Sequence, residues 1–299
     1  MMAIAAPART TPTTRLASAP RGRKRNRVLP NIPAGITATI WLLIAIVPIY
    51  YVVITSLKNQ TNFFSGNALL PPASPTLDNY ALVLQNNFLA YFANSLIVTL
   101  VSVAFAVAFA LMAAFAIVRG SLTSRRLRLS FSVFLLGLAI PLQAVIIPIY
   151  LMITRAGLYD SLIALILPSV AFSLPLSIII LVNFLRDIPN ELYEAMRVDG
   201  ASNWKMLTTM VLPLARPALT TVAIYDGLNV WNGFIFPLVL TQSPDKRVLP
   251  LALWSFQGEF TSNIPAVLAA VVLSTLPILA LYIFGRRQLL AGLTAGFGK

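Results

Sequence analysis

Residues 92–118, FANSLIVTLVSVAFAVAFALMAAFAIV, run for 27 positions without an Asp, Glu, Lys or Arg. The hydrocarbon core of a bilayer is about 30 Å thick, and a helix of roughly 20 apolar residues crosses it. Hydrocarbon offers no hydrogen-bond partner to backbone amides and carbonyls, so a stretch that crosses it is expected to be helical. Residues 92–118 therefore predict a membrane-spanning helix.

Five further apolar stretches of similar length flank this one along the chain. The 299 residues are 58% apolar and 10% charged, a composition typical of an integral membrane protein. We predict an all-α, polytopic membrane protein with six transmembrane helices, at about 36–57, 92–118, 129–153, 161–183, 217–240 and 264–285. With an even number of crossings, both termini lie on the same side of the membrane.

The basic residues predict which side that is. Of the 22 Lys and Arg residues, eighteen fall on the side of the termini and four on the other side. Basic residues are retained in the cytoplasm during insertion, so both termini and the loop at 184–216 are predicted to be cytoplasmic. Residues 1–35 are expected to form a disordered basic cytoplasmic tail near membrane lipid, and residues 36–299 the transmembrane domain.

The composition also disfavours several function classes. The net charge of +13 is spread over the tail and the membrane-flanking loops, so we expect no nucleic-acid partner. The chain has no Cys and no His, which removes thiol nucleophiles, thiolate ligands, the commonest general base and the commonest metal ligand. We therefore expect no catalytic residue, metal or cofactor. The chain also lacks the Gly-rich loop followed by Lys and Ser or Thr that cradles phosphates, so any ATP must be bound by another chain.

A polar segment at about 187–213 stands out between the fourth and fifth crossings. It reads ELYEAMRVDGASNWKMLTTMVLP from Glu191 to Pro213. A short helix is predicted to start at Pro189 and Asn190, with Asn190 capping the free amides, and to end where Gly200 adopts the left-handed conformation. A second helix is predicted from about Ser202 to Leu212, closed by Pro213. The segment contains four of the nine acidic residues, namely Asp187, Glu191, Glu194 and Asp199.

This segment resembles the EAA loop of ABC importer permeases, through Glu194-Ala195, Asp199-Gly200-Ala201 and Leu212-Pro213. In that family the loop forms a coupling helix that docks on the ATP-binding subunit. The resemblance implies the type I importer permease fold, with Glu194 pairing with the ATPase surface or the loop backbone and Gly200 supplying the turn. The coupling residues that it implies are Glu191, Glu194, Ala195, Asp199, Gly200, Ala201, Leu212 and Pro213.

Other motifs narrow the resemblance to the maltose-type branch of carbohydrate importers. They are LDNY at Leu77–Tyr80, NS at Asn94–Ser95, LPLARPAL at Leu212–Leu219, WNGFIFPL at Trp231–Leu238 and AGLTAGFGK at Ala291–Lys299. The resemblance implies a permease for a sugar or oligosaccharide in the cytoplasmic membrane of a bacterium or archaeon. It also implies four partner chains: two copies of an ATP-binding cassette subunit, a second and different permease, and an extracytoplasmic solute-binding protein.

Polar residues inside the predicted crossings are candidates for the solute path, because an unsatisfied polar group in lipid costs several kcal/mol. Asp226, Asn229 and Asn232 stand at i, i+3 and i+6 in the fifth crossing and form one stripe. The stripe could equally bond to the partner permease. Gln143 in the third crossing is a further candidate, with the alternative that it satisfies a kinked backbone.

Two other function classes are compatible with six crossings. An ion-coupled secondary transporter would use Asp226 as its proton or sodium site, but it has no need of an acidic cytoplasmic segment. A membrane-embedded enzyme would need a polar site with a base, for which a single Asp among Asn residues is poorly suited. The ABC import permease is therefore the preferred interpretation.

Overall fold

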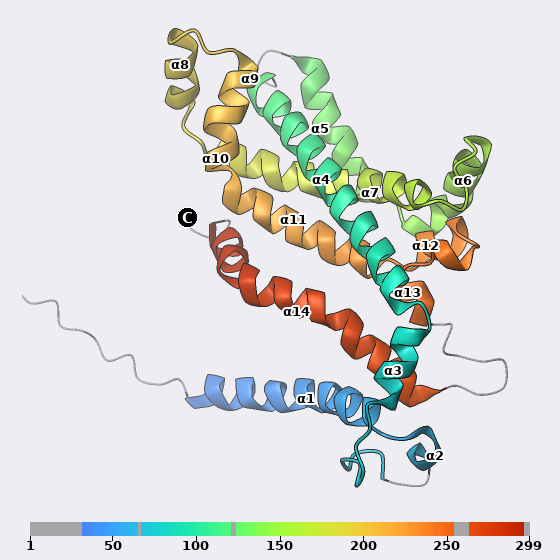
Figure 1. Cartoon of the computed structure of the whole chain (residues 1–299). Helices are drawn as coiled ribbons and strands as arrows, with labels where there is room; N and C mark the ends of the chain where they lie inside the picture. The colour runs from blue at the N-terminus through green and yellow to red at the C-terminus, as the bar shows by residue number, and fades with distance from the viewer. Residues whose placement is uncertain (1–31, 65–66, 121–123, 254–262, 296–299) are drawn as a thin grey trace, which may run out of the picture. The chain divides into compact units, whose positions relative to one another are not determined.

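The computed structural model describes residues 32–64, 67–120, 124–253 and 263–295, and all regular secondary structure in these ranges is helical (Figure 1). This confirms the all-α prediction. The predicted tail lies outside the described residues except for 32–35, which begin the first helix. The helices are α1 (Ile32–Ser56), α2 (Gln60–Phe63), α3 (Asp78–Gln85), α4 (Phe88–Gly120), α5 (Arg125–Gly137), α6 (Leu142–Arg155), α7 (Leu162–Arg186), α8 (Asn190–Val198), α9 (Asn203–Met206), the π-helical turn η1 (Leu207–Val211), α10 (Leu212–Leu214), α11 (Arg216–Trp231), α12 (Ile235–Leu240), the 3-10 turn η2 (Pro244–Lys246), α13 (Leu249–Ala252) and α14 (Ile264–Ala295).

The chain divides into two units, residues 1–46 and 47–299, and the boundary falls inside α1. In the first unit the described residues are the N-terminal part of α1. The other helices, and all of the contacts discussed below, belong to the second unit.

Three predicted crossings are continuous helices of spanning length and hydropathy. They are α1, α4 and α7, which correspond to the predictions at 36–57, 92–118 and 161–183. The sixth prediction, 264–285, lies within α14, a helix of 32 residues, whose apolar stretch within the fully described part is Ile264–Ala280. The described residues therefore hold three full-length spans, or up to five if each of two bent helix pairs counts as one.

The predicted crossing at 129–153 is not one straight helix. It is built from α5 and α6, which meet at an angle of 107°. Pro141 occupies the N-cap position of α6 in an extended conformation. Its ring fixes its own φ and disfavours the helical conformation for the residue before it, so a helix is interrupted at this point. Window hydropathy counts apolar residues and does not register such a break.

The predicted crossing at 217–240 is interrupted as well. Helix α11 ends at Trp231, and the short helix α12 begins at Ile235. Gly233 lies in the gap, where an added Cβ would come within 3.1 Å of the carbonyl oxygen of Val230. The backbone makes its turn at a point where a larger residue would be crowded.

Helix α4 packs along α7 and α11 and forms the centre of the second unit (Figure 1). Small residues spaced four apart on α4, Ala106, Ala110 and Ala114, are fully buried and allow the neighbouring backbones to approach closely. A larger buried cluster extends from these positions through Ile178 and Leu185 of α7 to Val222 of α11. This cluster also reaches the polar segment between α7 and α11.

The LDNY motif fixes the end of α1 to α3 through polar side chains. The Asn79 side-chain amide donates to the carbonyl oxygens of Ser56 and Lys58, both at 2.8 Å. The hydroxyls of Ser56 and Tyr80 are hydrogen-bonded at 2.7 Å. The motif therefore has a structural role in this chain.

The NS motif on α4 holds the segment that follows α12. The Asn94 side-chain amide donates to the carbonyl oxygens of Asp245 at 2.8 Å and Arg247 at 2.9 Å. The backbone N–H of Leu249 donates to the hydroxyl of Ser95 at 2.8 Å. The half-buried Asn94 and the buried Ser95 on α4 thus satisfy backbone groups that no helix satisfies.

Asp160, between α6 and α7, clamps the same segment from the other side. Its carboxylate accepts hydrogen bonds from the backbone N–H groups of Gln242 at 2.8 Å and Ser243 at 2.9 Å, and from the Ser243 hydroxyl. The Ser243 hydroxyl and then the two N–H groups lower the pKa of Asp160 below its ordinary value. A lowered pKa means that the clamp is intact above the ordinary Asp range and is lost as the pH falls through the lowered pKa.

We expect Asp160→Ala to release the segment at 242–243, because it removes three acceptor contacts at once. Amide hydrogen exchange at Gln242 and Ser243 should become at least about tenfold faster, the effect of losing a net hydrogen bond to a charged group. Asp160→Asn is the matched control: Asn tolerates the φ of +59° at this position and keeps an acceptor oxygen. Equal exchange rates in the Ala variant and the unmodified protein would contradict the clamp.

Candidate functional site

The first helix of the polar segment, α8, forms where the sequence predicts it, with one error at its start. Pro189 occupies the N-cap position in an extended conformation and makes no side-chain cap, while Asn190 is already the first helical residue. The prediction that Asn190 caps the amides is therefore wrong. Proline at this position fixes its own φ and lacks an N–H, so the helix can start directly after it.

The end of α8 confirms the predicted turn at Gly200. Asp199 is the C-cap and Gly200 follows with a φ of +73°. The N–H of Gly200 donates to the Arg197 carbonyl at 3.1 Å, and the N–H of Ala201 donates to the Met196 carbonyl at 2.9 Å. These two bonds form a Schellman motif, which requires the left-handed conformation that glycine adopts at least cost.

The second helical stretch starts as predicted but does not stop at Pro213. The hydroxyl of Ser202 accepts from the N–H of Lys205 at 3.2 Å and caps α9. The chain then continues through η1 and through Pro213 to Leu214. A π-helical turn changes the local hydrogen-bond register, so the missing N–H of Pro213 breaks no regular α-helical bond. The bend of 77° instead falls at Ala215, just before Pro217 at the start of α11.

One aromatic side chain, which the sequence reasoning missed, anchors α8 to the transmembrane core. Tyr193 is 1% exposed, although most side chains of α8 are exposed. Its ring lies 6.5 Å from the ring of Phe115, and the guanidinium of Arg119 lies 4.5 Å from its centroid. Both partners are near the end of α4. The feature of the sequence that could have indicated this anchor is an aromatic residue within an otherwise polar segment.

The environment of Tyr193 is apolar apart from the Arg119 guanidinium. Its hydroxyl is buried and has no hydrogen-bond partner among the described residues. Burial raises the pKa of Tyr193, against a smaller lowering by Arg119. Ile188, which precedes the N-cap, belongs to the same buried cluster as Tyr193, and this pair occupies the positions of a hydrophobic staple. The ring therefore holds α8 by packing and a cation–π contact.

The rest of α8 presents a mixed acidic and apolar face. Leu192 is 44% exposed and Val198 is 87% exposed, beside the acidic side chains of the helix. Met196 is partly buried against the core cluster and does not belong to this exposed face. Four of the eight predicted coupling residues belong to α8 and its C-cap, Gly200 and Ala201 form the turn that follows, and Leu212 and Pro213 lie on α10. Those exposed are Glu191, Glu194, Ala195, Asp199, Gly200, Leu212 and Pro213, whereas Ala201 is partly buried.

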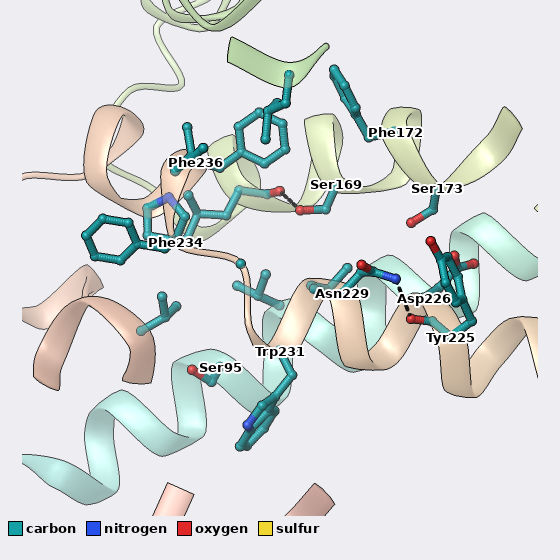
Figure 2. Close-up of a pocket in the computed structure, with 18 of the residues that line it drawn as sticks. Ser95, Ser169, Phe172, Ser173, Tyr225, Asp226, Asn229, Trp231, Phe234 and Phe236 are labelled. Carbon is teal, nitrogen blue, oxygen red and sulfur yellow. Dashed lines mark hydrogen bonds between the residues drawn. The ribbon is translucent and has the colours of Figure 1, made fainter. Parts of the chain in front are cut away.

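A cavity of about 490 Å³ lies beside α11, between α7 and α12 (Figure 2). Asp226 and Asn229, two of the predicted polar residues, line it. Asn232 does not: its side chain donates to the Leu228 carbonyl at 2.7 Å at the end of α11. Gln143 is exposed near the start of α6 and does not line the cavity either.

Asp226 is the polar centre of the cavity wall. It is 1% exposed, and the Ser177 hydroxyl of α7 donates to its carboxylate at 2.7 Å. Ser173 of α7 lines the cavity beside it. Figure 2 shows Ser173 directed from α7 toward Asp226 on α11. The described residues contain no group of three or more His, Cys, Asp or Glu that could hold a metal.

The Asn229 side chain donates to the Tyr225 carbonyl at 2.8 Å, which leaves its amide oxygen available to a ligand.

Aromatic side chains supply much of the remaining lining. Trp231 donates to the Ser274 carbonyl of α14 at 3.3 Å. The aromatic lining residues are Phe172, Tyr225, Trp231, Phe234 and Phe236.

Comparisons with known proteins agree on one family. Residues 106–289 match the family described as binding-protein-dependent transport system inner membrane component. A putative ABC transporter permease from Caldicellulosiruptor sp. is 45% identical over 87% of this chain and 94% of its own length. The trehalose/maltose transport system permease of Thermococcus litoralis is 34% identical over 91% of this chain and 98% of its own.

The fold also matches a solved structure. A crystal structure of a bacterial ABC transporter involved in the import of the acidic polysaccharide alginate contains a chain with a TM-score of 0.76 to this one. The two are 24% identical, and the match covers 86% of this chain and 95% of the other. The likeness confirms the importer permease fold.

The packing of Tyr193 predicts that two substitutions change the attachment of α8 to very different degrees. Tyr193→Ala should destabilise the attachment of α8 by about 3–5 kcal/mol, the usual cost of emptying a buried aromatic site. Tyr193→Phe should be neutral or slightly stabilising, because it removes a buried hydroxyl that has no partner. Limited trypsin cleavage after Arg197, an exposed residue of α8, reports this attachment. Faster cleavage in the Phe variant than in the Ala variant would contradict the anchor.

Proposed function

The chain belongs to the family of binding-protein-dependent transport system inner membrane components, and from this premise we propose that it is the permease subunit of an ATP-driven importer for a sugar or oligosaccharide. The observation that carries the proposal is α8, an exposed acidic helix held on the transmembrane core by one buried ring. The family is a transporter family and not a catalytic one. Its ABC relatives do not support an ion-coupled carrier that uses Asp226.

The coupling step is proposed to occur at α8. A permease without a nucleotide site receives work through contacts that differ between two conformations of its partner. The exposed face around Glu194, with Leu192 and Val198 beside it, provides charge and apolar area for an ATP-binding cassette subunit. Two copies of that subunit, a second and different permease, and an extracytoplasmic solute-binding protein complete the proposed assembly.

The proposed orientation places both termini and α8 in the cytoplasm. The support is the distribution of Lys and Arg, with eighteen residues on that side and four on the other. In this orientation α8 meets the cytoplasmic ATPase. The segment clamped by Asp160 and Asn94 then faces the solute-binding protein.

A carbohydrate is the proposed solute class. The trehalose/maltose permease supports it, as does the chemistry of the cavity, where aromatic faces accompany a few polar groups. Aromatic rings pack against the apolar faces of sugar rings, and carboxylate and amide groups bond to hydroxyls. Asp226 and Asn229 are the proposed solute-path residues, and Asn232 and Gln143 are proposed for the interface with the second permease.

Glu194→Ala should weaken or abolish recovery of the ATPase when the protein is purified from gently solubilised membranes. The variant removes an exposed charge from the proposed docking face without touching the Tyr193 anchor. Asp78→Ala is the matched control, because Asp78 is an exposed acidic residue in the first turn of another helix, α3. If the unmodified protein is recovered without an ATP-binding cassette subunit and a second permease, the assembly is wrong. Undiminished recovery in Glu194→Ala would remove that residue from the docking face.

Gly200→Val should leave the protein in the membrane while uncoupling uptake from ATP hydrolysis. No atom lies within 4 Å of the position of an added Cβ, so the expected cost is the left-handed backbone, about 1–2 kcal/mol. Gly200→Asn is the control, since Asn tolerates this conformation. Solute uptake and ATPase rate in reconstituted vesicles give the readout. Normal uptake by the Val variant would overturn the role of the turn.

A further inference from the structure

We propose that the cavity between α7, α11 and α12 discriminates solutes by charge, with Asp226 as the specificity-determining residue. It favours neutral or amino-bearing saccharides and disfavours those that carry a carboxylate or sulfonate. This inference rests on the proposed function, since it assumes that solute passes the cavity. It goes further by assigning a charge class to the solute.

The first support is the set of charges around the cavity. Among the described residues that line it, Asp226 is the one with a formal charge, and neither Lys nor Arg is present. The remaining polar lining is neutral, from serine hydroxyls and the Asn229 amide. An anionic saccharide would therefore meet a carboxylate here without a compensating cation from this chain.

The second support is the position of the carboxylate. Asp226 is held in the wall by the hydroxyl of Ser177, with 1% of its surface exposed. Charges that are buried are screened by salt much less than exposed ones. The negative field of Asp226 thus extends into the cavity.

The cavity is small enough for that field to reach a bound solute. Ser169 lines the cavity one helical turn before Ser173, a rise of about 6 Å along α7. Ser173 is directed toward Asp226, so Ser169 lies roughly one turn further along α7 from the carboxylate (Figure 2). At such separations, the interaction of two like charges at a partly buried site is large enough to change occupancy by at least about tenfold.

The similar proteins show that charge is a real variable among such transporters. One relative is named for trehalose and maltose, which are neutral, and the transporter with the matching fold is named for alginate, which is acidic. The chemistry of the lining favours a neutral or amino-bearing sugar over an acidic one in this chain.

Asp226 also ties α7 to α11, so a structural role must be separable from a role in selection. Asp226→Asn removes the charge but keeps a side-chain oxygen that accepts from Ser177. Ser177→Ala does the reverse, since it removes a hydrogen bond of the tie and leaves the carboxylate in place. If Asp226 selects solutes by charge, Asp226→Asn changes the selectivity. If Asp226 only ties the two helices together, Ser177→Ala has the effect instead.

Because the sequence contains no Cys, Ser169→Cys introduces a single thiol into the cavity. In the assembled transporter, this thiol is treated with two methanethiosulfonate reagents of similar size, one with a trimethylammonium and one with a sulfonate group. The measured quantity is the ratio of the two reaction rates. Asp226 also alters the ionisation of the thiol, but that affects both rates equally and cancels in the ratio. Gln85→Cys, on an exposed position of α3 outside the cavity, gives the intrinsic ratio.

We expect the ratio at Ser169→Cys to exceed that at Gln85→Cys by at least about tenfold in favour of the cation, a difference of about 1.4 kcal/mol. Asp226→Asn should bring the ratio down toward the Gln85→Cys value, and Ser177→Ala should leave it high. Three outcomes overturn the inference: a ratio equal to that at Gln85→Cys, a high ratio that Asp226→Asn does not lower, or a thiol that neither reagent reaches.

The test remains decisive if Asp226→Asn or Ser177→Ala fails to assemble. The ratio of the two rates at Ser169→Cys, measured with Asp226 unchanged, already supports or contradicts a negative field in the cavity. It also separates two kinds of failure. The reagents need neither ATP nor the correct sugar, so loss of the ATPase in the purification experiment, with a high ratio here, would overturn the import function and leave the charge preference standing. If the assembly is recovered but the ratio at Ser169→Cys equals that at Gln85→Cys, the charge preference is overturned and the import function stands.

Discussion

The packing of Tyr193 against Phe115 and under Arg119 is the contact on which the arrangement of the polar segment depends. A helix of nine residues is too short to be stable on its own in water, so α8 persists because tertiary packing holds it. Its other side chains are mostly exposed and contribute little to that packing. One buried ring therefore makes the exposed face of α8 a defined surface.

The partners of Tyr193 lie near one end of α4, and this helix carries a second set of contacts near its other end. Asn94 and Ser95 hold the segment that follows α12, which Asp160 clamps from α6 and α7. Asn94 and Arg119 are about 38 Å apart along a straight helix. A displacement of α8 that moved α4 as a rigid body would move that segment as well. The same helix thus connects the proposed ATPase contact to the proposed contact with the solute-binding protein.

The limits of the sequence reasoning follow from what each pattern measures. Hydropathy sums predicted the continuous helices α1, α4 and α7, but they passed over the breaks at Pro141 and Gly233, which depend on backbone geometry at single residues. The turn at Gly200 was predictable because few residues adopt its φ. The anchor at Tyr193 was missed because a search for charged residues disregards the aromatic one between them. The bond between Ser177 and Asp226 joins residues 49 positions apart, and no local pattern contains it.

The hydrogen bond that connects α7 to α11 does not require a carboxylate at position 226. An amide or hydroxyl at this position could bond to Ser177 without the cost of desolvating a charge. Replacing buried charged groups by neutral ones of similar volume is often neutral or stabilising, so stability alone is a weak reason for Asp226. What the carboxylate adds to the tie is a negative field, and that field acts where Asp226 borders open space. The cavity is that space, and a solute within it is the object on which the charge can act.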